Sequence, residues 1–219
     1  MTAAPRILLR HATHIGSGRP AAAAAFAGAL SRALLEPPDA SLRAALVAVW
    51  RDAAEWDELF APASRLACAA EAADLDASRK EHARLFLGPN PAPCLPYESV
   101  WTEVPPLLMG RSHRDALGLY RKAGFAPRGT DPADHVGVQM GFIALLASRI
   151  AAGLDERATL EVFWARHVEN WIPSFGERVA RNAQCPFYRT LGAVLAEVTR
   201  WPTPAEKMTA APVGPKEER

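Results

Sequence analysis

The stretch from Val136 to Ser148 constrains the fold of this chain most, because its 13 residues carry no charge. A transmembrane helix needs about 20 predominantly apolar residues, so this stretch is too short to span a bilayer, and Arg149 ends it. Its apolar side chains recur at helical spacing over almost the whole circumference of a helix. The stretch therefore predicts a buried helix at the centre of an α-helical fold.

The ends of this central helix are also marked in the sequence. Asp131 is predicted to be its N-cap, with Pro132 at the first helical position, and Gly153 is predicted to end it. Gly137 and Gly141 lie one turn apart on one side of the helix. Without a Cβ at these two positions, another backbone can approach the central helix closely.

The other elements read as helices too. Apolar periodicity, with proline and glycine as stop signals, predicts helices over residues 21–35, 41–59, 64–73, 76–87, 112–123 and 160–171, and two more after Pro173 and Pro186. No segment alternates with the period of a strand. We therefore predict an all-α, single-domain bundle of about eight to ten helices over residues 21–201. Residues 1–20 are predicted to be a mobile lead and residues 202–219 a disordered tail.

Composition excludes some classes of protein. The net charge of +1 gives no basic face for nucleic acid. Cys68, Cys94 and Cys185 are too far apart for a C-x-x-C pair, which argues against a disulfide framework and a cysteine-bound zinc and favours a reducing compartment. The alanine-rich residues 21–30 favour a first helix of a cytoplasmic protein over a targeting segment.

Catalytic motifs are largely missing. The chain has neither a G-x-x-x-x-G-K-[ST] phosphate loop nor a G-x-S-x-G nucleophile motif, so covalent catalysis has no support. His82, His113, His135 and His167 lie on four predicted segments that could converge, which leaves a helical metal- or haem-binding enzyme as the alternative function. His167 falls in the apolar stripe of its helix, and we expect it to be a core histidine hydrogen-bonded to a neighbouring carbonyl.

A proline-rich segment, EHARLFLGPNPAPCLPYESVW, runs from Glu81 to Trp101. Its four prolines exclude a regular helix or central strand, so the segment is expected to be stiff and to hold the side chains after it in a fixed pose. If the predicted central helix begins beside it, five polar residues would rim an apolar pocket: Glu98, Glu103, Asp131, Asp134 and His135. Asp134 has an equally good structural explanation, as a carboxylate in the first turn of the helix.

These residues resemble the TorD/DmsD/NarJ-type redox-enzyme maturation chaperones. The first family motif is matched by Leu85, Phe86, Gly88, Pro89, Pro96, Tyr97, Ser99, Val100 and Trp101. The second, an acid-Pro-x-Asp-His start to the central helix, is matched by Asp131, Pro132, Asp134 and His135. The third, His-x-x-x-Trp-x-Pro-x-Phe, is matched by His167, Trp171, Pro173 and Phe175. His82 departs from the pattern, which usually has tyrosine there.

The resemblance implies an all-α cytoplasmic chaperone without a cofactor rather than an enzyme. Such proteins bind the twin-arginine signal peptide or N-terminal region of the apo catalytic subunit of a molybdopterin-dependent oxidoreductase, and assist its folding and molybdenum-cofactor insertion before export or assembly. Some members also bind guanine nucleotide weakly, although no phosphate loop supports this here. The resemblance and the pattern together give a predicted peptide-binding set: Leu85, Phe86, Gly88, Pro89, Pro96, Tyr97, Glu98, Ser99, Trp101, Asp131, Asp134 and His135.

Overall fold

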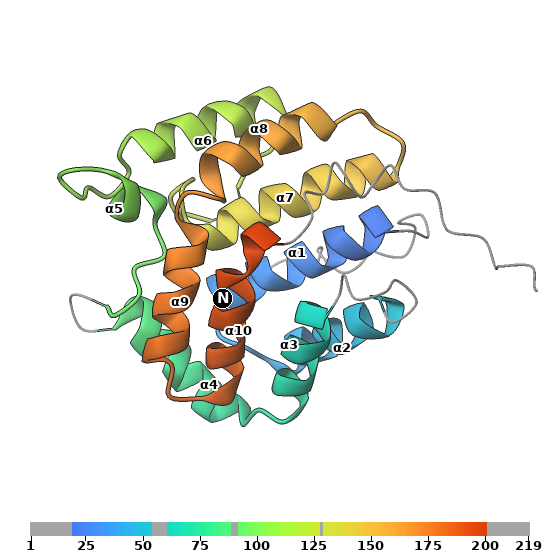
Figure 1. Cartoon of the computed structure of the whole chain (residues 1–219), viewed down its shortest axis with the longest axis vertical. Helices are drawn as coiled ribbons and strands as arrows, with labels where there is room; N and C mark the ends of the chain where they lie inside the picture. Colours follow the sequence, from blue (N-terminus) through green and yellow to red (C-terminus); the bar gives the residue numbers. More distant parts are fainter. Residues whose placement is uncertain (1–18, 54–60, 89–91, 128, 201–219) are drawn as a thin grey trace, which may run out of the picture.

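The structure, a computed structural model, describes residues 19–53, 61–88, 92–127 and 129–200 (Figure 1). Within these ranges it is all-α, as predicted. The α-helices are α1 (Arg19–Leu35), α2 (Ala40–Ala53), α3 (Ala61–Glu71), α4 (Leu75–His82), α5 (Glu98–Thr102), α6 (Arg111–Lys122), α7 (Val136–Ala151), α8 (Arg157–His167), α9 (Ile172–Asn182) and α10 (Pro186–Ala196). A π-helical turn, Ala83–Leu87, continues α4, and a 3-10 turn, Val198–Arg200, follows α10. The predicted tail and nearly all of the predicted lead lie outside the described residues.

The predicted central helix, α7, packs side by side with α1 through the middle of the molecule (Figure 1). Their close approach depends on the two glycines of α7. A Cβ added to Gly137 would lie 3.1 Å from the carbonyl oxygen of Ser31, and one added to Gly141 would lie 3.2 Å from the Ser31 hydroxyl. That hydroxyl donates a 2.7 Å hydrogen bond to the carbonyl of Gly137. The predicted close approach of another backbone is therefore confirmed at Gly137, whereas Gly141 faces the side chain of Ser31.

The remaining helices cover α7 and α1 and build one continuous core. Beside α7, Phe142 contacts Tyr120 of α6 and Phe163 of α8, at ring-centroid distances of 4.7 and 4.8 Å. Toward α9 and α10, Phe86 contacts Phe175 and Tyr188, at 6.2 and 5.6 Å. Aromatic rings thus join the π-helical turn and most of the later helices to the same core. No helix in the described ranges has the length and apolar character needed to cross a bilayer.

The helix ends agree with the sequence at some positions and differ at others. Gly153, with φ of +86°, follows the end of α7, and prolines open both α9 and α10. The predicted helix over residues 160–171 ends earlier, at His167, because the chain turns through residues 168–171 into α9. The start of α7 was predicted wrongly, because its N-cap is His135 and Asp131 lies before the helix.

Candidate functional site

The proline-rich segment and the start of α7 lie against each other. Tyr97 and His135 form an isolated antiparallel bridge. On either side of it, the Glu98 amide donates to the carbonyl of Asp134 at 3.0 Å, and the Val136 amide donates to the carbonyl of Pro96 at 2.9 Å. The expectation that these two motif segments meet is therefore confirmed.

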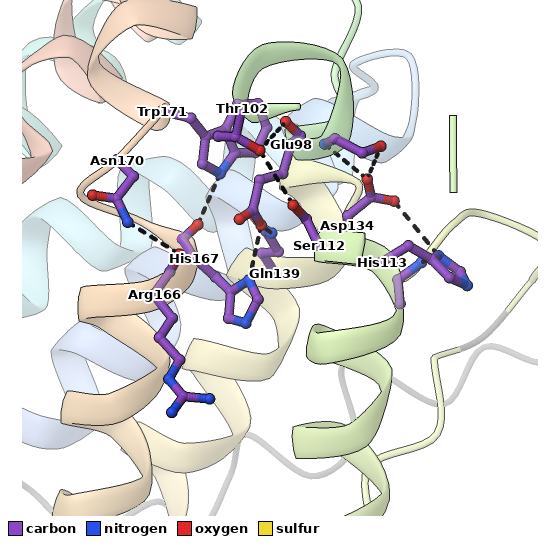
Figure 2. Close-up of polar contacts among 12 residues, drawn as sticks. Glu98, Thr102, Ser112, His113, Asp134, Gln139, Arg166, His167, Asn170 and Trp171 are labelled. Carbon is purple, nitrogen blue, oxygen red and sulfur yellow. Dashed lines mark hydrogen bonds and ion pairs between the residues drawn. The ribbon is translucent and has the colours of Figure 1, made fainter. Parts of the chain in front are cut away.

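The Asp134 carboxylate is completely buried at this contact and serves as a cap for a different helix. Its Oδ2 atom accepts from the amide of Ser99 at 3.0 Å and from the Ser99 hydroxyl at 2.5 Å, which satisfies the first turn of α5 (Figure 2). Its Oδ1 atom lies 3.5 Å from Nδ1 of His113. That nitrogen accepts a 3.0 Å hydrogen bond from the amide of Ala133. Asp134 therefore holds α5 against the start of α7, and the hydrogen bond from the Ala133 amide to His113 holds α6 there.

The Glu98 carboxylate is also buried, with only 3% of the residue exposed. Its Oε2 atom accepts a 2.6 Å hydrogen bond from the side-chain amide of Gln139 on α7 and lies 2.9 Å from Nδ1 of His167 on α8 (Figure 2). The prediction that His167 is a core residue is confirmed, but its ring partner is this carboxylate instead of a carbonyl. The carbonyl of His167 accepts from the indole N–H of Trp171 at 2.8 Å. All three sequence motifs thus converge on Glu98 and Asp134.

The predicted acidic rim is wrong as a description of this surface. Glu98 and Asp134 lie in the interior, and Asp131 is exposed. The carboxylate of Glu103 accepts from the amide and hydroxyl of Ser112, at 2.8 and 3.1 Å, and these hydrogen bonds lower its pKa. Buried carboxylates need donors in place of water, and here N–H and O–H groups from neighbouring helices supply them. Glu98 and Asp134 therefore brace the segments and do not present charge to a ligand, whereas Asp131 remains at the surface.

His135 has a structural role of the same kind. Its Nδ1 atom accepts a 3.0 Å hydrogen bond from the amide of Gly137, which caps the N-terminus of α7. The ring packs edge-on against Tyr97, with centroids 5.4 Å apart. Burial lowers the pKa of His135 to about 4, although the nearby Asp134 acts in the opposite direction. The side chain is therefore neutral at pH 7, as a hydrogen-bond acceptor at a helix cap must be.

The other predicted peptide-binding residues fall into two groups. Leu85, Phe86 and Pro96 are buried, so they contribute to the core and not to an open groove. Gly88 is needed locally, because a Cβ there would lie 2.6 Å from the carbonyl oxygen of Arg84. Pro89 lies outside the described residues. Among the residues after the loop, Ser99 is buried, whereas Tyr97 and Trp101 are partly exposed and are the aromatic residues of the set that reach the surface.

One surface feature was not singled out from the sequence. The six residues Val104–Met109, here called the apolar loop, join α5 to α6 and are all exposed. Val104 is 99% exposed, and Leu107, Leu108 and Met109 are each more than half exposed. The sequence signal was present as a run of apolar residues and two prolines that has no helical partner face.

The four histidines considered as metal ligands have separate surroundings. His113 and His167 contact Asp134 and Glu98 respectively, and His135 caps α7. His82 is buried beside Phe86, 5.2 Å away between ring centroids. In the part of the chain that the structure describes, no three histidine, cysteine or acidic residues are grouped so that they could hold a metal ion.

Comparison with known proteins places the chain in a family. The family model for the nitrate reductase delta subunit matches residues 25–177. The chain is 33% identical over 118 residues to the Tat proofreading chaperone DmsD of Salmonella typhi, which covers 53% of this chain and 55% of that protein. It is 28% identical over 118 residues to the chaperone protein TorD of Shewanella loihica, which covers 51% of this chain and 54% of that protein. The chain thus spans about half the length of the curated relatives that it matches.

A solved structure supports the fold assignment. The crystal structure of a proposed redox enzyme maturation protein from Archaeoglobus fulgidus superimposes with a TM-score of 0.58, covering 81% of this chain and 93% of that chain at 19% identity. At this identity the likeness concerns the fold alone. The family model covers most of the chain and includes all three motifs. The chain is therefore a member of the nitrate reductase delta subunit family, together with relatives that include DmsD and TorD chaperones.

Proposed function

We propose that this protein is a cytoplasmic chaperone, not an enzyme. Its client is the twin-arginine signal peptide or N-terminal region of a molybdopterin-dependent oxidoreductase, which it holds during folding and molybdenum-cofactor insertion, before export or assembly. Family membership and the names of the DmsD and TorD relatives support this proposal. Nucleotide binding is not part of it.

The observation that carries the proposal is the exposed apolar loop. A leader peptide has an apolar run, so its receptor needs accessible apolar surface. The loop supplies four of the seven large hydrophobic residues that are exposed in the described part of the chain. Scattered single hydrophobic residues are normal on a protein surface, whereas a contiguous group typically marks an interaction site.

The loop is also built to stay exposed. Pro105 and Pro106 restrict its backbone, and Met109 has φ of +57°, a left-handed conformation that costs a non-glycine residue about 1 kcal/mol or more. At the base, Gly110 packs so tightly on the Glu103 carboxylate that a side chain there would force this carboxylate to move. The hydrogen bonds from Ser112 to Glu103 hold the two ends of the loop together. A loop fixed in this way presents its apolar side chains at little further entropy cost on binding.

The buried network explains how the motif residues serve such a surface. Glu98 belongs to α5, which leads into the loop, and Thr102 at the end of α5 donates to the carbonyl of Glu98 at 3.1 Å. Glu98 in turn contacts α7 and α8 through Gln139 and His167. The motif residues therefore fix the position of α5, and through it the base of the apolar loop.

The test removes apolar surface from the loop without touching the core. Partial burial of an exposed leucine on binding contributes about 1 kcal/mol to the binding free energy. Leu107→Ser with Leu108→Ser should therefore weaken binding of a synthetic twin-arginine leader by roughly thirtyfold, as measured by fluorescence anisotropy. In pull-downs from the native host, the variant should also lose a molybdopterin oxidoreductase subunit that the parent retains and that mass spectrometry identifies.

Leu154→Ser is the matched control, because Leu154 is also 55% exposed but lies after α7. It should bind the leader like the parent protein, and thermal melts of all variants should coincide. Unchanged leader affinity in the double variant, or an equal loss in the control, would contradict the proposed function of the loop.

A further inference from the structure

A hollow of about 430 Å³ lies between α5 and the outer face of α9. Six residues line it: Trp101, Ser174, Glu177, Arg178, Arg181 and Asn182. All except Trp101 come from α9, whose apolar side faces the core and whose polar side is left to solvent. Trp101 belongs to the predicted peptide-binding set, but the other lining residues do not belong to any of the three motifs.

Trp101 forms a rigid apolar wall of this hollow. Its indole N–H donates to the carbonyl of Leu95 at 2.9 Å. The ring packs edge-on against Phe175, with centroids 6.0 Å apart, and contacts Trp171 at 6.4 Å. The ring orientation is therefore set by the core, and the partly exposed remainder of the ring is available to a ligand.

The charge in the hollow is positive. The guanidinium of Arg178 lies over the Trp101 ring, 5.7 Å from its centroid. Among the described residues it has no carboxylate within ion-pair distance. Arg181 lies 3.7 Å from Glu177, and since both side chains are more than half exposed, this pair contributes little. Of the two guanidiniums that line the hollow, only that of Arg181 has a carboxylate within ion-pair distance, and that of Arg178 is left without one in the described residues.

The position of Arg178 over the Trp101 ring determines which ligand fits. A guanidinium that lies on an aromatic face keeps its N–H edge free, and that edge matches the two oxygens of a carboxylate. A single negative charge balances the one uncompensated guanidinium, whereas the doubly charged phosphate group would meet Glu177 with an excess of negative charge. The Trp101 ring would cover the apolar atoms beside the bound carboxylate.

We infer that this hollow binds an acidic side chain of a partner peptide that has apolar residues next to the acid. The inference rests on the proposed function, because the peptide would belong to the client. It gives the surface beside Trp101 a polarity opposite to that of the acidic rim expected from the sequence. It also gives the client a second point of attachment besides the apolar loop.

The test uses a fluorescein-labelled leucine–serine peptide with glutamate, glutamine or lysine at its centre. Fluorescence anisotropy with the full chain at low salt should show the glutamate peptide binding roughly fivefold more tightly than the glutamine peptide, with the lysine peptide weakest. The preference should shrink as salt is added. Arg178→Gln should abolish it, and Arg178→Lys should restore it only partly, because lysine cannot make the two-pronged contact.

Arg166→Gln is the control, since Arg166 is an exposed arginine on α8 that points away from the buried Glu98 network (Figure 2). It should leave the glutamate preference unchanged. No glutamate preference in the parent, or a preference that survives in Arg178→Gln, would overturn the inference. Displacement of the peptide by inorganic phosphate at lower concentration than by acetate would overturn it in favour of a phosphate site.

The outcome is separable from that of the proposed function. If leader binding is lost in the loop variant but the parent shows no glutamate preference, the chaperone proposal stands and the acidic-residue site fails. If the loop variant binds the leader as tightly as the parent while the glutamate preference is present, the acidic-residue site stands and the role of the apolar loop fails. If the parent binds no leader and retains no molybdopterin oxidoreductase subunit, the chaperone proposal itself fails.

Discussion

Glu98→Ala tests the structural role of the buried network most directly. The substitution removes the carboxylate that accepts from Gln139 and contacts His167, and it leaves both groups without this partner in the interior. A buried polar group without a partner costs about 1–3 kcal/mol, and the removed side-chain atoms leave a cavity as well. We therefore expect the free energy of unfolding to fall by about 3–4 kcal/mol.

Urea denaturation followed by circular dichroism measures this change as a shift in midpoint at constant slope. For a chain of this size, the thermal midpoint should fall by roughly 6–16 °C. Glu98→Gln keeps the shape and one acceptor oxygen but loses the charge, so it should lose only about 1 kcal/mol. Glu161→Ala, at an exposed position on α8, controls for the removal of a glutamate from the surface.

The reasoning would be refuted if Glu98→Ala unfolded within about 0.5 kcal/mol of the parent protein, which is the range of ordinary surface substitutions. The same result would revive the idea that this carboxylate is available to ligands. If instead the expected loss is observed, weaker leader binding by Glu98→Ala reports on folding, and the surface variants in the apolar loop and in α9 are the proper tests of recognition.

Three further changes have expected outcomes. Burial lowers the pKa of His135 from 6.5 to about 4, so as the pH falls the unfolded chain binds the proton before the folded protein does. The free energy of unfolding should therefore be highest above pH 6.5 and fall by about 3 kcal/mol toward pH 4. In urea titrations at several pH values, His135→Asn should flatten this slope, because asparagine can still cap α7 but does not titrate. Gly137→Ala should lower the thermal midpoint by crowding Ser31, at a cost of about 1–3 kcal/mol, whereas Gly118→Ala, with open space around it, should raise the stability slightly. His82→Phe should stabilise the protein by about 1 kcal/mol in urea, because burial of the His82 ring is compensated at most by a poorly aligned hydrogen bond to the backbone of Leu34, while its contact with Phe86 can be kept.

Local signals in the sequence were sufficient for much of the fold. The apolar composition of α7, the glycines that face α1 and the prolines that open α9 and α10 act within one or two turns of the chain. Such features are visible without knowledge of tertiary contacts. The family motifs in addition identified the residues that lie together around Glu98 and Asp134.

Long-range partners explain the errors. Asp131 and Pro132 have the residue types of a helix start, but the Asp134 carboxylate is used by Ser99, 35 positions away, and α7 begins only after His135. Burial of Glu98 likewise depends on Gln139 and on a histidine 69 positions away. Neither contact can be inferred from the spacing of residues in the sequence, so two carboxylates that brace the interior were predicted to line a cleft.

The hydrogen bonds from Ser112 to Glu103, which hold the two ends of the apolar loop together, have a kinetic consequence. A recognition element that is already assembled requires no opening step before its partner docks. Leader association measured by stopped flow should therefore be a single phase whose observed rate rises linearly with protein concentration, without a plateau. The disadvantage is that the free protein always exposes this apolar surface, so its tendency to self-associate should rise when little client is present.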